Sequence, residues 1–207
     1  MKVYNSSLGA ATRALRIILS LKQIFIETID IDMASGENRN QDFLKINPAG
    51  VLPCIEFDNG KVIGEVTAIA EYLDEIYPKK VLSGSTPEER AETRMRMRQC
   101  DWFVIVPLAN AFRHGRGKKF FSGRINIYEC LSDPSLKLAK DGMEWIDSHL
   151  HNNTYLCGSR LSYADIVFYS MIKFLLNAMQ ISIKSDFPYL NNYIVKLDLD
   201  EGLEKIK

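Results

Sequence analysis

The sequence of 207 residues has no long uncharged apolar run, no net charge and no clustered cysteines. No stretch approaches the ~18 apolar residues that a membrane-spanning helix needs, so we expect no membrane insertion. The 26 basic and 26 acidic residues cancel to a formal net charge of zero. This balance provides no bulk attraction for nucleic acid or for an anionic membrane, and we expect neither as a partner.

The cysteines show none of the spacings that bind zinc or mark a dithiol motif. They are far apart in the chain, at Cys54, Cys100, Cys130 and Cys157. We therefore expect no metal and interpret the cysteines as reduced thiols in a cytoplasmic protein. The N-terminal residues lack the apolar core of a signal peptide, and we interpret residues 2–5 as a first strand.

The segment from residue 47 to residue 72 carries the clearest local pattern. Asp58-Asn59-Gly60 separates two strand-like runs and predicts a β-hairpin, because Asn and Gly both tolerate positive φ. Apolar residues then recur with helical spacing over residues 66–76. Pro53 cannot donate a ladder hydrogen bond, so we expect it at a strand start or a sheet edge, after a bond that is readily cis.

The residues before this hairpin predict alternating strands and helices. We expect a helix over residues 13–21 after a loop over 6–11, a strand over 24–31 and a short helix over 41–46. With the first strand, the hairpin and the helix after it, the predicted order is βαβαββα.

The second half of the chain predicts helices only. Thr86 followed by Pro87 predicts a capped helix start, and Pro107 predicts a kink in the long helix that follows. We expect a basic loop over residues 114–123 and a second long helix over 134–150.

The last predicted helices follow a second capping signal. Ser162 and Asp165 stand at the N-cap and third positions of a helix over residues 163–179, which is apolar almost all round and therefore predicted to be buried. A final helix over residues 188–197 precedes a short charged tail.

Three motifs in this chain resemble one family. Residues 47–53 read Asn-Pro-Ala-Gly-Val-Leu-Pro, and residues 65–73 read Glu-Val-Thr-Ala-Ile-Ala-Glu-Tyr-Leu, with Asp-Asn-Gly between them. This string resembles the glutathione-binding core of the glutathione S-transferases. Residues 158–165, Gly-Ser-Arg-Leu-Ser-Tyr-Ala-Asp, are similar to a segment of that family's helical domain. The resemblance extends from residue 1 to about residue 197.

The resemblance implies a fold class of α/β plus all-α. We expect a thioredoxin-like βαβαββα domain over residues 1–76, a linker over 77–86, and an all-helical bundle domain over 87–207. The resemblance also implies a homodimer with the site at the boundary between the domains.

The resemblance implies a detoxification enzyme that conjugates, or otherwise uses, reduced glutathione with small hydrophobic electrophiles. The alternative is a non-catalytic module of the same fold that binds other proteins. Val66 and Gly9 favour the module, because the family pattern often has serine at both positions. Glu65 and the pair Leu52-Pro53 match the family pattern and favour the enzyme.

The resemblance also assigns roles in glutathione binding. Glu65 would hold the γ-glutamyl ammonium, and the backbone N–H groups of Val66 and Thr67 would hold its carboxylate. Leu52, before a cis-Pro53, would pair with the cysteinyl backbone. The alternative role for Glu65 is simple stabilisation of a helix N-terminus.

The group that activates the thiol is less clear from the sequence. The family donates a hydrogen bond to the glutathione thiolate from a residue just after the first strand. Ser7 is the first candidate because its neighbours are small, and Ser6 and Thr12 are the others, although Thr12 also fits a helix cap. The backbone N–H of Gly9, also a predicted ligand contact, or of Ala10 remains open. Tyr4, on the first strand, is expected to pack.

The acceptor pocket is predicted on the long helix of the second half. Trp102 and Phe103 offer aromatic faces, and Arg98, Arg113 and His114 offer positive charge for an anionic acceptor. The alternative for the two aromatic residues is packing between helices.

Overall fold

A computed structural model describes residues 1–200 of this protein. Its sheet has the strand order β2-β1-β3-β4, with β1 and β2 parallel and the other two pairs antiparallel. The strands are β1 (Lys2–Asn5), β2 (Glu27–Asp30), β3 (Cys54–Glu56) and β4 (Val62–Gly64). The Phe57 N–H donates to the Lys61 carbonyl at 2.8 Å and closes the predicted hairpin.

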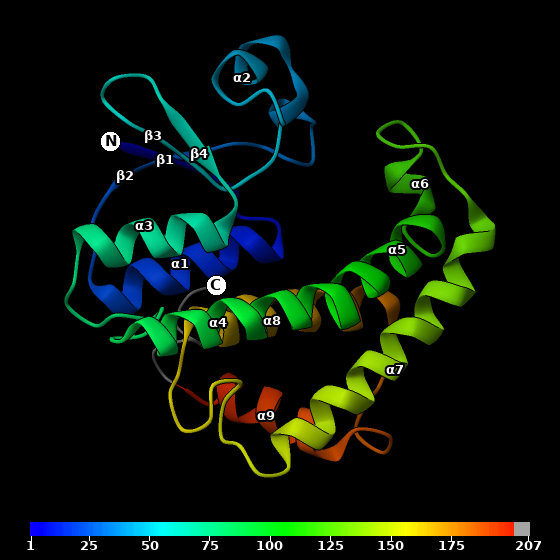
Figure 1. The fold of residues 1–207 in the computed structure, drawn as a ribbon. Helices are drawn as coiled ribbons and strands as arrows, with labels where there is room; N and C mark the ends of the chain where they lie inside the picture. Colours follow the sequence, from blue (N-terminus) through cyan, green and yellow to red (C-terminus); the bar gives the residue numbers. More distant parts are fainter. Residues whose placement is uncertain (201–207) are drawn as a thin grey trace.

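Helices cover both faces of this sheet (Figure 1). α1 (Ala10–Lys22) and α3 (Val66–Ile76) lie on the face toward the second half of the chain, and α2 (Gln41–Ile46) lies on the opposite face, after the short η1 (Glu37–Arg39). The order β1-α1-β2-α2-β3-β4-α3 confirms the predicted thioredoxin-like arrangement.

The second half is helical, as predicted. Its elements are α4 (Pro87–Cys100), the π-helical η2 (Asp101–Ile105), α5 (Val106–His114), α6 (Lys118–Phe121), η3 (Glu129–Leu131), α7 (Ser132–Leu150), α8 (Tyr163–Met179) and α9 (Pro188–Asp198). α8 contacts α1, α3, α4, α5 and α9, and its apolar residues belong to the main core. This confirms the prediction that this apolar helix is the buried centre.

Some predicted boundaries were wrong. α1 begins at Ala10, inside the expected loop, and β2 is shorter than the expected strand. The segment 114–123 is not only a loop, because α6 forms within it. The predicted charged tail lies mostly outside the described residues. α3 ends at Ile76 and α4 begins at Pro87, while the domain limits at 76 and 87 stay predictions.

A buried ion pair fixes the connection between α3 and α4. The Lys22 ammonium donates to the Asp74 carboxylate at 2.6 Å and to the Tyr77 carbonyl at 2.9 Å. The second Asp74 oxygen accepts the Leu82 N–H at 2.8 Å. Both charged side chains are almost completely buried. Each charge offsets the desolvation cost of the other, so removing either partner would leave an uncompensated buried charge. It orients α1 and α3 against the helices that follow.

Both predicted helix caps are present. Thr86 Oγ1 accepts the Glu89 N–H at 3.2 Å. At the start of α8, the Asp165 carboxylate accepts the Ser162 N–H at 2.9 Å, in a capping box, and the Leu156 N–H at 2.8 Å. Burial raises the pKa of Asp165, which is fully enclosed.

The segment before Pro107 is a turn of π-helix. Pro107 has no N–H to donate to the Phe103 carbonyl, so regular α-helical bonding cannot pass through this point. α7 crosses here at Gly142, where an added Cβ would lie 2.0 Å from the Phe103 carbonyl oxygen. The helix therefore continues through Pro107 with a local widening, and α7 packs directly against it.

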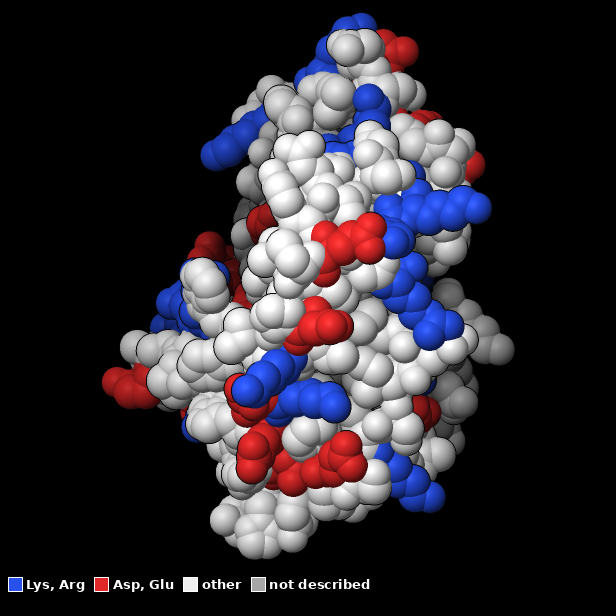
Figure 2. Space-filling view, turned by 90° about the vertical axis from the view of Figure 1, so that its right-hand side faces the viewer, with Lys and Arg blue, Asp and Glu red and all other residues white. Residues whose placement is uncertain are grey.

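The surface of the described residues carries charge of both signs. On the face that Figure 2 shows, basic and acidic side chains are intermixed with neutral surface between them. None of the helices over residues 1–200 is long and apolar enough to cross a membrane. Within the same range, no group of three or more His, Cys, Asp or Glu side chains is arranged to hold a metal ion.

Candidate functional site

The N-terminus of α3 carries an acidic side chain without a partner. Glu65 is the N-cap residue, with φ 62° and ψ 115°, a backbone conformation that non-glycine residues rarely adopt. Its exposed side chain makes no capping hydrogen bond, and no ion pair to it is recorded among residues 1–200. Strained residues of this kind cluster at functional sites. The alternative role of Glu65, stabilisation of the helix N-terminus, therefore rests on its charge alone and not on a capping hydrogen bond.

The first backbone N–H groups of α3 are also free. The first helical hydrogen bond of α3 runs from the Ile69 N–H to the Glu65 carbonyl at 3.0 Å. The N–H groups of Val66 and Thr67 have no recorded acceptor among the described residues, and no acidic residue stands in the first turn. An exposed helix start of this kind favours an anionic group. A carboxylate and a pair of free donors thus stand side by side, as an α-amino acid head group requires.

Asp101 adds a second negative charge near this point. It is the first residue of η2, in the helical half, and it is half-buried. Burial raises the pKa of Asp101 to about 6, the Arg98 guanidinium opposes this effect, and the charge of Glu65 adds to it. The two carboxylates repel each other across the boundary between the halves, so a positive group between them would be stabilised.

Leu52 and Pro53 stand just before β3. The peptide bond between them is cis, as expected from the sequence. Leu52 is half-buried, and its N–H and C=O take part in no recorded hydrogen bond among residues 1–200. This free donor and acceptor pair can bind an extended peptide backbone, as an edge strand does.

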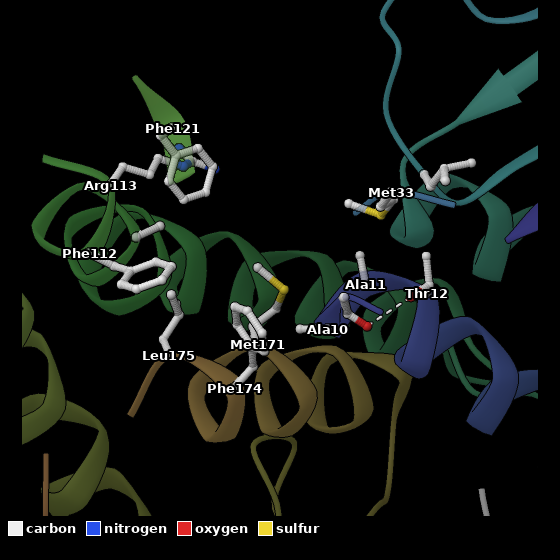
Figure 3. Close-up of a pocket in the computed structure, with 13 residues that line it drawn as sticks. Ala10, Ala11, Thr12, Met33, Phe112, Arg113, Phe121, Met171, Phe174 and Leu175 are labelled. Atoms are coloured by element: carbon white, nitrogen blue, oxygen red, sulfur yellow. Dashed lines mark hydrogen bonds between the residues drawn. The ribbon is translucent and has the colours of Figure 1, made fainter. Parts of the chain in front are cut away.

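Leu52 also lines an apolar cavity of about 180 Å³. Figure 3 shows side chains from the start of α1 and from Met33 on one side, from α5 and Phe121 on the other, and from α8 beneath them. Phe112 lies edge-to-face with Phe121 at 5.9 Å and with Phe174 at 6.4 Å between ring centroids. Such a lining suits an apolar, flat ligand.

Of the residues predicted to form the acceptor pocket, only Arg113 lines this cavity among the described residues. Arg113 is the one titratable side chain among the described lining residues. Trp102 and Phe103 do not line this cavity. Phe103 lies edge-to-face with Trp145 of α7 at 5.4 Å between ring centroids, which fits the alternative of packing between helices. His114 is buried, and its Nδ1 accepts the Tyr128 N–H at 3.3 Å.

The structure separates the three hydroxyl candidates. Thr12 lines the apolar cavity, and its Oγ1 lies 2.8 Å from the carbonyl oxygens of both Leu8 and Gly9 (Figure 3). It does not cap α1, because the N-cap is Gly9. Ser6 is buried, and its Oγ accepts the Leu8 N–H at 3.3 Å. Ser7 is exposed and lines a different cavity, which shares Gly9 and Ala10 with the apolar one.

Two other predicted positions are explained by their surroundings. Tyr4 packs on the α2 side of the sheet, and its hydroxyl donates to Glu56 at 2.7 Å. Burial and this hydrogen bond raise the pKa of Tyr4 to about 12. Gly9 adopts φ 103° and ψ 142°, a region that is essentially restricted to glycine. A serine at position 9 would therefore be strained, which gives a physical reason for its absence.

Comparison with known proteins agrees with this geometry. The family model "Glutathione S-transferase, N-terminal domain" matches residues 10–76. The family model "Glutathione S-transferase, C-terminal domain" matches residues 136–205. The two models thus match both halves of the chain.

Individual relatives carry the same family name or share its fold. Glutathione S-transferase 2 of Saccharomyces cerevisiae is 29% identical over 174 residues, which are 80% of this chain and 72% of that protein. A maleylacetoacetate isomerase of Pseudomonas aeruginosa is 34% identical over 115 residues, 54% of this chain and 53% of that protein. The crystal structure of Gtt2 from Saccharomyces cerevisiae has a TM-score of 0.88, with 23% identity and complete coverage of both chains, which establishes the fold. This protein belongs to the glutathione S-transferase family.

Proposed function

We propose that this protein binds reduced glutathione along Glu65, the start of α3 and Leu52, and joins the glutathione sulfur to a small hydrophobic electrophile in the apolar cavity. The observation that carries the proposal is the unpaired Glu65 carboxylate beside free N–H groups. Leu52 connects the glutathione contacts to the acceptor cavity, because its backbone N–H and C=O are free and the residue lines the cavity.

Each charged part of glutathione has a complementary group. The γ-glutamyl ammonium would lie at Glu65, in the negative field that Asp101 strengthens. The adjacent carboxylate would accept hydrogen bonds from the N–H groups of Val66 and Thr67. The cysteinyl N–H and C=O would pair with Leu52, before Pro53, which directs the sulfur toward the start of α1.

The start of α1 is the proposed source of thiol activation. Gly9 and Ala10 line the cavity with free backbone at the positive end of α1, where a thiolate is favoured over a thiol. The thiol proton would leave to solvent, and the thiolate would form a carbon–sulfur bond at the electrophilic carbon. On a chlorodinitrobenzene the carbon–chlorine bond would then break, and chloride would leave with its bonding electron pair. Thr12 is the one hydroxyl of the three candidates in this cavity. Ser7 does not line this cavity, so we propose backbone activation rather than activation by Ser7.

The acceptor is proposed to be an aromatic or similarly flat electrophile. Phe112, Phe121 and Phe174 would contact its apolar surface. Arg113 stands at the same cavity with no recorded ion pair among residues 1–200, and its guanidinium lies 6.0 Å from the Phe121 ring. An anionic substituent on the acceptor would meet this charge. The turnover ratio of 4-chloro-3,5-dinitrobenzoate to neutral 1-chloro-2,4-dinitrobenzene should therefore fall in Arg113→Gln.

Calorimetric titration with reduced glutathione tests the binding site. We expect Glu65→Gln to weaken binding about 10- to 100-fold, because a hydrogen bond to a charged group contributes about 1.5–3 kcal/mol. Glu75→Gln, an exposed acid on the same helix, is the matched control and should bind normally. Equal affinity of wild type and Glu65→Gln would refute the ammonium role. No binding to the wild type would refute the proposed function and favour a protein-interaction module.

We further propose that the protein is a cytoplasmic homodimer. All four cysteines are free in the structure, as a reducing compartment requires. Trp102, Phe103 and Val106 expose apolar surface on one helical stretch, which a second copy of the chain would cover. Sedimentation should show a dimer that Trp102→Glu weakens, and a monomeric wild type would contradict this proposal.

A further inference from the structure

A separate cavity, of about 190 Å³, lies between the middle of α1 and the strands β1 and β2. We call it the strand-edge cavity, because Thr28 and Asp30 of the edge strand β2 line it and are exposed. A ligand can reach the cavity from this edge of the sheet. The strand-edge cavity shares no lining residue with the apolar cavity, so none of the acceptor contacts proposed above lies in it.

Asn5 brings a buried amide oxygen without a hydrogen bond to this cavity. Asn5 is the last residue of β1, one of the two central strands, and it is 3% exposed. Tyr4 packs on the α2 side of the sheet, so Val3 and Asn5, on either side of it, face α1. No partner for the Asn5 Oδ1 is recorded among residues 1–200. Buried polar atoms are almost always satisfied, so this oxygen indicates an absent donor.

Arg16 supplies the complementary atom. Its Nε is buried and has no recorded partner among the same residues, while a terminal nitrogen of the guanidinium donates to the Ser6 carbonyl at 2.6 Å. Asn5 and Arg16 line the same cavity, so a free acceptor and a free donor occur together there. One group that satisfies both has to donate and accept at once. A carboxamide does so through its nitrogen and its oxygen, whereas a carboxylate only accepts and an ammonium only donates.

The charges at the strand-edge cavity favour a neutral ligand. Arg16 and Asp30 are the two charged residues in its described lining, one of each sign. The negative charge of Asp30 acts on Arg16 electrostatically, although no ion pair joins them in the described part of the chain. An anion would meet repulsion from Asp30, and a cation would meet repulsion from Arg16.

The rest of the lining is apolar, and the space exceeds that of one water molecule. Val3 and Leu15 are buried, and Leu19 is partly buried. A single water would satisfy both polar atoms, but it needs only roughly 15 Å³ of the cavity. Further waters beside the three apolar side chains would lack the polar partners that hold buried water in place. An apolar ligand body suits this part of the cavity better than water does.

We propose that the strand-edge cavity binds a small neutral carboxamide. The amide N–H donates to the Asn5 Oδ1, and the amide oxygen accepts the Arg16 Nε–H. The apolar body of the ligand contacts Val3, Leu15 and Leu19. This site is separate from the proposed glutathione site and does not depend on that function.

Benzamide and acetophenone test the site, because they have nearly the same size and shape and only benzamide carries N–H donors. Titration followed by NMR of the isotope-labelled protein locates each ligand and gives its affinity. Benzamide should shift the Asn5 and Thr28 amide signals and the Arg16 Nε–H signal. It should bind about three- to tenfold more tightly than acetophenone, the effect of one hydrogen bond.

Three results with the wild-type protein would overturn the proposal. The first is equal affinity for the two ligands, and the second is no shift at these signals with millimolar benzamide, as expected if the cavity holds water only. The third is a set of shifts confined to Gly9 and Phe112, which would place benzamide in the apolar cavity instead.

Asn5→Leu makes the matching change on the protein, because it replaces the amide by an apolar group of similar size. The preference for benzamide over acetophenone should disappear in this variant, since the methyl group of acetophenone then meets an apolar side chain. Asn177→Leu, the same change at an exposed position on α8 outside this cavity, is the control and should keep the wild-type preference. A preference that persists in Asn5→Leu would refute the contact with Asn5. If Asn5→Leu does not fold, the two ligands still decide the question on the wild-type protein.

Discussion

Replacing Asp101 by asparagine should stabilise the protein at neutral pH and should lose this effect in acid. The Asp101 carboxyl group is half-buried at the start of η2, where the charge of Glu65 acts on it. Burial raises the pKa of Asp101 from 3.8 to about 6, with Glu65 adding to the rise and Arg98 opposing it. The folded protein therefore binds this proton more tightly than the unfolded chain does.

The sign and size of the effect follow from this difference. Because the folded pKa is raised, the free energy of unfolding falls as pH rises from about 4 to about 6, and the penalty is complete above that. A rise from 3.8 to about 6 corresponds to about 3 kcal/mol without solvent screening. Asp101 is not fully enclosed, so screening reduces the expected value to about 1 kcal/mol. Asp101→Asn removes this penalty.

Chemical denaturation at several pH values measures the effect. The unfolding free energy of Asp101→Asn should exceed that of wild type by about 1 kcal/mol at about pH 7.5 and match it near about pH 4. Asp141→Asn, at an exposed position on α7, is the control and should follow wild type. A difference that is the same at every pH would refute the reasoning, because a packing effect does not titrate.

The same experiment tests the electrostatic effect of Glu65 on Asp101. In Glu65→Gln the neighbouring negative charge is gone, so the advantage of Asp101→Asn at neutral pH should shrink. A double-mutant cycle isolates this coupling. Full additivity of the two changes would mean that burial alone shifts Asp101, and that the two carboxylates do not share an electrostatic field.

Three further changes have expected costs. Asp165→Asn should destabilise the protein by about 3 kcal/mol, because buried N–H donors lose their acceptor; denaturation measures this, and a loss below about 1 kcal/mol would contradict the buried capping box. Gly142→Ala should cost about 2–3 kcal/mol through contact with the Phe103 carbonyl, whereas Gly123→Ala meets open space and should cost little. Gly9→Ser should cost about 2 kcal/mol from backbone strain and should not raise turnover.

The thioredoxin-like half could be predicted because its signals are local. Asn59-Gly60 specifies a hairpin turn, and Thr86, Ser162 and Asp165 specify helix starts through contacts within one turn. The start of α1 was misplaced for an equally local reason. Gly9 is its N-cap without a capping side chain, so the first turn has no capping signature to detect.

The acceptor cavity could not be predicted in the same way. Phe112, Phe121 and Phe174 come from three separate helices and meet only after α5, α6 and α8 have packed. Trp102 and Phe103 are the more conspicuous aromatic residues in the sequence, but neither lines this cavity, and Phe103 packs against Trp145 of α7. The lining of such a pocket depends on how distant helices pack together, and the spacing of residues along the chain does not predict that packing.

The start of α1 lies beside two cavities with different chemistry, the apolar cavity and the cavity that Ser7 lines. Gly9 and Ala10 line both cavities, and the free start of α1 stabilises negative charge placed beside it. On one side the lining is apolar, so the sulfur of glutathione would be the negative group. On the other side Arg13 and Arg16 supply positive charge, so a thiolate at the start of α1 is favoured by the helix end and by these two side chains together.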